Sequence, residues 1–158
     1  MRLRGQRVVI ARPFNHLGPG QSTNFVVPAL VMRLLDARQR GDDHIAVGDL
    51  STRRDFSDVR DVVRAYRLLA EFGLSGEVYN IASGHDVALS DIAAQLVSQL
   101  APGVALVVDP SLLRPVDIPV FRGSYEKLSD ATGWSPQIPL PRTLEDVVND
   151  LVERRQET

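Results

Sequence analysis

The chain contains no cysteine, and its only lysine, Lys127, stands beside seventeen arginines. Disulfides, thiolate metal sites and cysteine nucleophiles are therefore excluded, and a reducing compartment is permitted. Any reaction that needs a catalytic lysine depends on this one position. No apolar run approaches the ~18 residues of a membrane span, and the apolar stretch after residues 1–7 is too short for a signal peptide. The sequence predicts a cytoplasmic protein with no membrane partner.

Charge of one sign is also not in excess, since eighteen basic side chains face twenty acidic ones and the net charge is −2 at pH 7. Without a strongly basic face, nucleic acid is not a predicted partner. Apolar residues make up 44% and charged residues 24% of the 158 positions, as in a folded globular chain. No linker, repeat or low-complexity tract divides the sequence. Residues 1–158 therefore read as a single segment.

Apolar patterns predict strands that alternate with helices, which is typical of an α/β fold. Short β-branched runs predict strands at residues 7–11, 44–47, 54–57, 77–82 and 105–108. The first of these strands reads as buried on both faces, as in a parallel sheet. Apolar residues at helical spacing predict helices at about 25–39, 59–73, 90–100, 124–133 and from 143 to the end.

Side chains that cap helices are expected at four of these helix starts. They are Thr23 or Asn24, Ser90, Ser124, and Thr143 with Asp146 as a capping box. Residues 110–122 contain three prolines and no periodicity. This composition predicts a long loop of the kind that carries function.

Residues 12–21 lie where the first predicted strand leads into a loop, which is where open α/β sheets bind ligands. Asn15 can offer both an amide donor and a carbonyl acceptor to a sugar hydroxyl. The alternative is a Gly-Pro turn with a local Asn cap, and the spacing alone does not decide between the two. Gly18-x-Gly20 is not a phosphate-binding fingerprint, because the third glycine is missing and Pro19 lies inside it.

Two arginines could hold a diphosphate through paired hydrogen bonds. Arg54 belongs to an alternately charged segment, residues 53–61, that enters a predicted helix. The commoner explanation of such a segment is a solvated cluster of ion pairs. The same two interpretations apply to Arg114 and Asp117 in the proline-rich segment. No pair among the three histidines has the spacing of metal ligands, so no metal site is predicted.

Several motifs together resemble the carboxyl half of extended short-chain dehydrogenase/reductases that act on nucleotide sugars. They are Arg-Pro-Phe-Asn-His-x-Gly-Pro-Gly-Gln at 12–21, Asn-Phe-Val at 24–26, Val-Gly-Asp-Leu at 47–50, Arg-Asp-Phe-x-Asp-Val-Arg-Asp at 54–61, Val-Tyr-Asn-Ile-Ala-Ser-Gly at 78–84, Arg-Pro-x-Asp at 114–117 and Thr-Gly-Trp-x-Pro at 132–136. The resemblance covers about residues 7–151. It implies half of a Rossmann-type fold, in which a few parallel strands carry helices and a small substrate-binding lobe.

Within that group the chain is most similar to GDP-6-deoxy-D-mannose reductases and next to GDP-mannose 4,6-dehydratases. Residues 17–21 read Leu-Gly-Pro-Gly-Gln, which resembles the reductase version of this loop. The resemblance implies reduction of the C4 ketone of GDP-4-dehydro-6-deoxy-D-mannose to GDP-D-rhamnose, with NADP or NAD as cofactor and a GDP-sugar as ligand.

The resemblance also implies roles for individual residues. Asn15 and Asn24 would contact the sugar and diphosphate, Phe25 and Val26 would wall the pocket, Arg54 and Arg114 would bind the phosphates, Asp117 would meet a ribose or base edge, and Pro13, Phe14 and His16 would line the nicotinamide.

Two motifs of that family are missing from the sequence. There is no Gly-x-x-Gly-x-x-Gly turn for the dinucleotide, and no Tyr-x-x-x-Lys pair, since the residue four before Lys127 is Gly123. We therefore expect no catalytic residue in this chain, an absent amino-terminal half that binds most of the cofactor, and no activity of the chain alone. The alternative is a truncated, non-catalytic nucleotide-sugar binding fragment. Uncovered strands would favour self-association or binding of a separate amino-terminal half.

Overall fold

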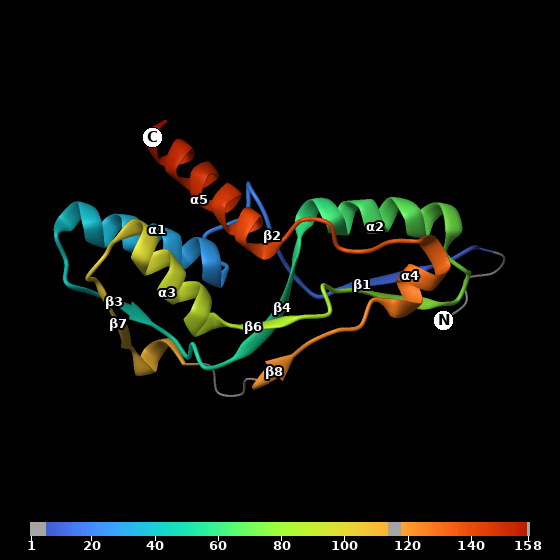
Figure 1. Ribbon diagram of the computed structural model, residues 1–158, viewed down its shortest axis with the longest axis horizontal. Coiled ribbons are helices and arrows are strands. Elements are labelled where there is room, and N and C mark those ends of the chain that lie inside the picture. The colour runs from blue at the N-terminus through green and yellow to red at the C-terminus, as the bar shows by residue number, and fades with distance from the viewer. Residues whose placement is uncertain (1–5, 114–117, 158) are drawn as a thin grey trace.

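The computed structural model describes residues 6–113 and 118–157 (Figure 1). Its strands are β1 (Ile10–Pro13), β2 (Asn15–Leu17), β3 (His44–Val47), β4 (Arg53–Asp58), β5 (Val78–Ile81), β6 (Asp86–Ala88), β7 (Ala105–Val108) and β8 (Val120–Phe121). Its helices are α1 (Val26–Arg40), α2 (Val59–Phe72), α3 (Leu89–Leu100), α4 (Glu126–Thr132) and α5 (Leu140–Gln156), with a 3-10 turn, η1 (Pro110–Leu112).

The strands form three small sheets in which parallel pairing dominates. β1 pairs parallel with β5, Ile10 opposite Val78, and β3 pairs parallel with β7. The third sheet has the order β2-β4-β6, with β2 and β8 parallel to β4 and β6 antiparallel to it. Parallel neighbours need crossover connections, which the helices supply. The predicted α/β class is therefore confirmed.

Two separate hydrophobic cores support these sheets. The β3 lobe consists of β3, β7, α1, α3 and α5, and its core includes Leu30, Leu34, Ile92, Leu96 and Leu144. The β1 lobe consists of β1, β5, α2 and α4, and its core includes Val62, Leu69, Tyr79, Leu128 and Trp134. β4 runs between the lobes and leads directly into α2.

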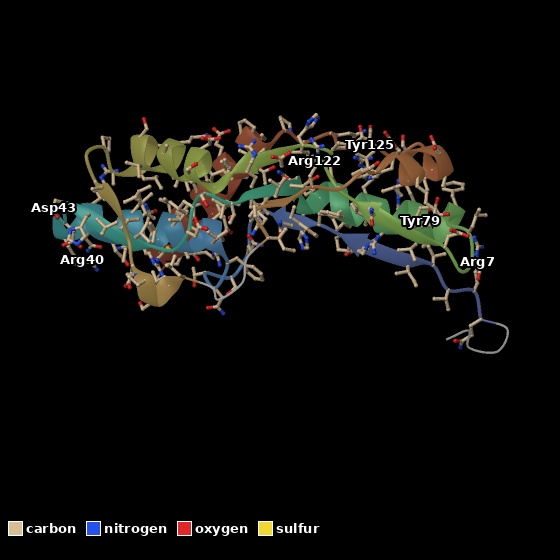
Figure 2. The ribbon with its side chains drawn as sticks, turned by 90° about the horizontal axis from the view of Figure 1, so that it is seen from below. Arg7, Arg40, Asp43, Tyr79, Arg122 and Tyr125 are labelled. Carbon is tan, nitrogen blue, oxygen red and sulfur yellow. The ribbon has the colours of Figure 1, made fainter. Side chains whose placement is uncertain are left out.

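The first strand differs from its prediction in position and in burial. β1 begins at Ile10 rather than residue 7, and Val8 and Ile10 are 41% and 48% exposed. Within the described residues β1 pairs only with β5. Figure 2 shows β1 at the border of its lobe, with no described element beyond it. The prediction of burial on both faces is wrong, because nothing in the described chain covers the second face.

The predicted helix caps are wrong in most cases. The N-cap residues are Phe25, Ala88, Tyr125 and Pro139, and none of them caps with its side chain. Ser124 still accepts a hydrogen bond from the N–H of Glu126 at 3.2 Å. Thr143 lies inside α5, which starts earlier because a proline sits in its first turn, where the missing N–H costs nothing.

The predicted long loop at 110–122 is shorter than expected. η1 occupies its beginning, and β8 pairs with β4 near its end. β2, β6 and β8 were not predicted, because strands of two or three residues are too short to show a period. Arg114 and Asp117 lie outside the described residues.

Candidate functional site

The segment from Pro13 to His16 joins two of the small sheets. Pro13 ends β1 opposite Ile81, and the N–H of Phe14 donates to the Ile81 carbonyl oxygen at 2.9 Å. The chain then enters β2, where Asn15 lies opposite Phe56 of β4. Residues 15–17 thus form a short strand where a loop was predicted. The expected position, at the carboxyl end of a parallel strand, is that of ligand sites in α/β sheets.

Phe14 and His16 are fixed by local contacts. The ring of Phe14 stacks on that of Phe121, with centroids 4.6 Å apart. Nδ1 of His16 lies 3.0 Å from the carbonyl oxygen of Phe14. Because a carbonyl oxygen only accepts hydrogen bonds, this contact is a hydrogen bond in the tautomer that carries its proton on Nδ1.

Asn15 has an unfilled hydrogen-bonding capacity. Its amide nitrogen is buried and has no hydrogen-bond partner among the described residues. Buried polar side-chain atoms normally have a partner, so an orphaned donor at a strand end indicates a place for a ligand or water. This observation favours the sugar-binding interpretation of Asn15 over the local cap, for which no hydrogen bond from its side chain is found.

The start of α1 carries three predicted substrate residues. Phe25 and Val26 are 56% and 38% exposed, and Asn24 is exposed just before them. No side chain caps this helix, and its first turn contains no acidic residue. The first N–H groups of a helix lack partners within it and carry partial positive charge. This end of α1 can therefore receive a phosphate group, which fits the role that the resemblance implies.

Arg54 is tied to the backbone of the segment before β8. Its Nη1 donates to the carbonyl oxygen of Ile118 at 2.6 Å and to that of Arg53 at 2.9 Å. Since Arg114 lies outside the described residues, the prediction that the two arginines hold one diphosphate stays a prediction.

Three aspartates of the charged segment are buried, so the alternative of a solvated ion-pair cluster is wrong for them. Asp55, Asp58 and Asp61 are 0%, 2% and 2% exposed. Burial alone would raise the pKa of Asp58, but hydrogen bonds from Arg60 and Thr143 outweigh it and hold this pKa below its ordinary value. The segment is thus a buried polar junction between the lobes.

Asp55 is the clearest buried polar residue at the site that the sequence reasoning missed. Its Oδ1 accepts hydrogen bonds from the N–H and the hydroxyl of Ser83 at 2.8 and 2.7 Å. Its Oδ2 accepts from the N–H groups of Gly84 and Gly123 at 3.0 and 3.2 Å. Asp55 therefore fixes β4 to two distant segments. Its partners are too far away in the sequence for a local pattern to signal this role.

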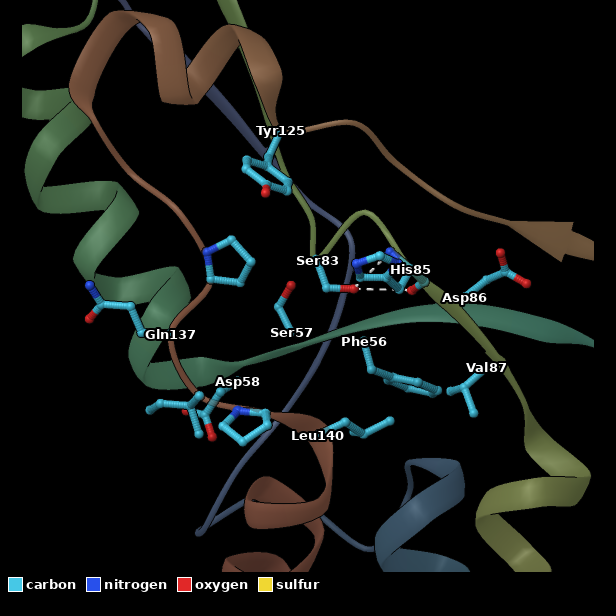
Figure 3. A pocket seen from close by; sticks show the side chains of 13 residues that line it. Phe56, Ser57, Asp58, Ser83, His85, Asp86, Val87, Tyr125, Gln137 and Leu140 are labelled. Atoms are coloured by element: carbon cyan, nitrogen blue, oxygen red, sulfur yellow. Dashed lines mark hydrogen bonds between the residues drawn. The ribbon is translucent and has the colours of Figure 1, made fainter.

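A cavity of about 530 Å³ opens beside β4 (Figure 3). It is lined by β4, residues 83–87, Tyr125 and residues 136–140, and none of the described residues predicted to bind substrate or cofactor lines it.

Within the described part of the chain, no group of three or more His, Cys, Asp or Glu side chains could hold a metal ion. No helix there is long and apolar enough to cross a membrane.

Comparison with known proteins decides the family. The model of the GDP-mannose 4,6 dehydratase family matches residues 2–147. The chain belongs to this family. The GDP-6-deoxy-D-mannose reductase of Pseudomonas aeruginosa is 36% identical over 154 residues, which are 97% of this chain and 51% of that enzyme. The GDP-6-deoxy-D-talose 4-dehydrogenase of Aggregatibacter actinomycetemcomitans is 31% identical, over 80% of this chain and 42% of that enzyme.

A solved structure agrees with the sequence relationship. The RMD protein of Pseudomonas aeruginosa, complexed with NADPH, is 36% identical and superposes with a TM-score of 0.85, over 95% of this chain and 50% of that one. The chain thus spans about half the length of the relatives it matches. The resemblance to the carboxyl half of a nucleotide-sugar reductase is confirmed, and so is the Rossmann-type fold class.

The residues that the resemblance assigns to the cofactor could meet only one edge of a nicotinamide and not a whole dinucleotide. Asn15 stands between Phe14 and His16 in the sequence, and its buried amide nitrogen has no partner among the described residues. The sequence has no glycine-rich turn that could approach the diphosphate of a dinucleotide.

Proposed function

We propose that this chain is the substrate-binding part of an NAD(P)-dependent nucleotide-sugar oxidoreductase in the cytoplasm. The reaction is reduction of the C4 ketone of GDP-4-dehydro-6-deoxy-D-mannose to GDP-D-rhamnose. The observation that carries the proposal is the 36% identity to GDP-6-deoxy-D-mannose reductase over nearly the whole chain. The unpartnered Asn15 amide and the uncapped start of α1 support it, because both suit a polar, phosphate-bearing ligand.

The chain's own residues bind and orient the substrate in this proposal. Asn24 and the start of α1, with Phe25 and Val26 as its wall, hold the diphosphate. Arg54 and Arg114 add positive charge, and Asp117 meets the ribose or base. Asn15 contacts the sugar.

Pro13, Phe14 and His16 border the nicotinamide, which when bound supplies the hydride for the ketone carbon. Reduction also needs a proton at the ketone oxygen. No Tyr-x-x-x-Lys pair exists in this sequence to supply it, so an amino-terminal half supplies the proton donor and most of the cofactor site.

The free edge of β1 offers a place for that half. β1 pairs on one side only within the described residues, and Val8 and Ile10 expose apolar side chains there. Unpaired strand edges and apolar patches recruit other chains. A separate amino-terminal half, or a second copy of this chain, would cover them.

The test combines binding with reconstitution. GDP is titrated calorimetrically into the purified chain, and NADPH oxidation is then followed with the 4-keto sugar nucleotide, with and without a separately produced amino-terminal half. We expect GDP binding by the chain alone and turnover only in the mixture. Turnover above a no-protein control by the chain alone would contradict the assignment, as would a lack of GDP binding.

Two alternatives have specific support. The chain could be half of a GDP-mannose 4,6-dehydratase, since the matching family model carries that name. In that case the reconstituted mixture converts GDP-mannose instead of reducing the 4-keto sugar. The chain could also be a non-catalytic nucleotide-sugar binding fragment, as the missing motifs suggest. GDP binding without turnover in any mixture would then be observed.

A further inference from the structure

The cavity beside β4, here called the β4 cavity, is separate from the residues assigned to GDP-sugar binding. It is bounded by β4, the turn between β5 and β6, Tyr125 and the segment between α4 and α5 (Figure 3). Its volume of about 530 Å³ lies within the range of small-molecule sites. A cavity of this size, unused by the proposed reaction, needs an explanation of its own.

Two buried carboxylates hold the walls of the β4 cavity in place. Oδ2 of Asp61 accepts hydrogen bonds from the N–H groups of Gln137 and Ile138 at 2.8 and 2.9 Å, which fixes one wall. Asp55 fixes the opposite wall through the backbone of Ser83 at 2.8 Å. The cavity is therefore preformed, as ligand sites usually are.

Two hydroxyl groups in the cavity have no hydrogen-bond partner among the residues that the structure describes. Ser57 is only 4% exposed, and its Oγ is buried without a hydrogen bond among the described residues. Figure 3 shows the Tyr125 hydroxyl directed toward Ser57, and no described residue hydrogen-bonds to it. A buried polar atom rarely lacks a partner, so Ser57 points to an occupant of this space.

The charges around the β4 cavity disfavour an anion. Asp58 lines the cavity but is held by Arg60 at 2.7 Å, and Asp86 is held by Arg53 at 2.5 Å. No lysine or arginine lines the cavity. Among the lining side chains only the His85 imidazole can become cationic, so a phosphate or carboxylate would meet two carboxylates and no permanent cation. A neutral ligand is the one that suits this site.

We propose that the β4 cavity binds a neutral, polyhydroxylated ring such as a pyranose. Hydroxyl groups both donate and accept hydrogen bonds, which complements the hydroxyls of Ser57 and Tyr125. The C–H groups of such a ring can pack on the apolar side chains of Phe56, Val87 and Leu140, which line the same cavity. This second sugar site is independent of the GDP-sugar site.

The probe for this proposal is methyl α-D-mannopyranoside, titrated into the full chain and followed by NMR chemical shifts. Ser57→Ala and Tyr125→Phe each remove one hydroxyl from the cavity, and each is expected to raise the dissociation constant about tenfold. Ser90→Ala and Tyr66→Phe remove the same groups from exposed positions on α3 and α2, and are expected to leave the dissociation constant unchanged. Tyr125→Phe keeps the ring that contacts Trp134 edge-on, so it preserves the fold.

Three results would overturn the proposal. They are no binding of the probe, equal weakening in all four variants, and displacement of the probe by GDP. Displacement would place the sugar in the nucleotide site. GDP binding is measured separately on the same variants, where we expect no change. Failure of the second sugar site is thus distinguishable from failure of the proposed function.

Discussion

The hydroxyl of Thr143 donates a hydrogen bond to Oδ2 of Asp58 at 2.7 Å, and both side chains are buried. Asp58 is also the N-cap of α2, where it accepts a hydrogen bond from the N–H of Arg60 at 2.8 Å. This pair joins α5, which packs in the β3 lobe, to the first turn of the principal helix of the β1 lobe. It is a polar connection between two apolar cores.

Replacing Thr143 with valine keeps the side-chain shape and removes this connection. We expect a loss of about 1.5–3 kcal/mol in the free energy of unfolding, because the lost hydrogen bond goes to a buried carboxylate. Urea unfolding measures the change. Thr23→Val, at an exposed position before α1, is the matched control and should alter stability little. Equal stability of the two variants would show that the pair does not hold the lobes together.

The pKa of Asp58 makes stability depend on pH in a defined direction. Its folded-state pKa lies below the ordinary value of 3.8, so the unfolded chain binds the proton more readily. The stabilisation is therefore complete above about pH 4 and is lost as the pH falls through the folded-state pKa. Asp58→Asn should lower stability at pH 7 and flatten its decline in acid, as followed by thermal melts. Asp130→Asn, at an exposed position, should leave the wild-type acid profile unchanged.

The absence of a side chain at Gly123 leaves room for the ring of Phe14. A Cβ at Gly123 would lie 2.8 Å from atoms of that ring and 2.6 Å from the Cβ of Ala82. Gly123→Ala should therefore destabilise the chain by about 1–3 kcal/mol through overpacking. The double variant Phe14→Leu with Gly123→Ala should lose less than the sum of the single variants, which a double-mutant cycle measures. Additive losses would place the strain elsewhere.

Arg54 provides a direct test of the nucleotide site. Arg54→Ala should weaken GDP binding about tenfold to a hundredfold, since charged hydrogen bonds to phosphate contribute about 1.5–3 kcal/mol. Arg38→Ala, which removes an exposed arginine late in α1, is the calorimetric control and should bind GDP normally. Unchanged affinity in Arg54→Ala, with an unchanged melting temperature, would remove the phosphate role.

The free edge of β1 should make the isolated chain associate. We expect sedimentation velocity to show mass that rises with concentration, because Val8 and Ile10 expose apolar surface next to an unpaired strand edge. Val8→Lys with Ile10→Lys should shift the chain toward monomer. Val63→Lys, on an exposed position of α2, should not. A clean monomer at all concentrations would show that the described fold is self-sufficient.

The sequence correctly predicted the helices and strands whose bounds are set by local residue patterns. α2 was expected at 59–73 and lies at Val59–Phe72, because its apolar residues keep helical spacing up to Gly73. β3 and β7 occupy their predicted ranges. Asp55 was not recognised as a buried junction, because the donors that satisfy it belong to residues 83, 84 and 123. The residues next to Asp55 in the sequence are charged, and a charged segment of this kind is equally typical of an exposed surface.

The candidate site was predictable only in part for the same reason. The motif at 12–21 correctly indicated the end of a parallel strand, but it gave no sign that Asn15 would enter a second strand opposite Phe56. The β4 cavity was not predicted at all. Its walls come from four separate parts of the chain, so only the folded arrangement brings Ser57 and Tyr125 together.

The division into two cores has an evolutionary consequence. Pro13 ends β1 of the β1 lobe, Phe14 follows it, and both are assigned to the nicotinamide. The start of α1 is assigned to the diphosphate and belongs to the β3 lobe. Substitutions that repack one lobe need not disturb the other. In related proteins with this fold, the preference for the sugar nucleotide and the preference for the cofactor can therefore change through separate substitutions. The sequence of β4, which runs between the lobes, can stay the same.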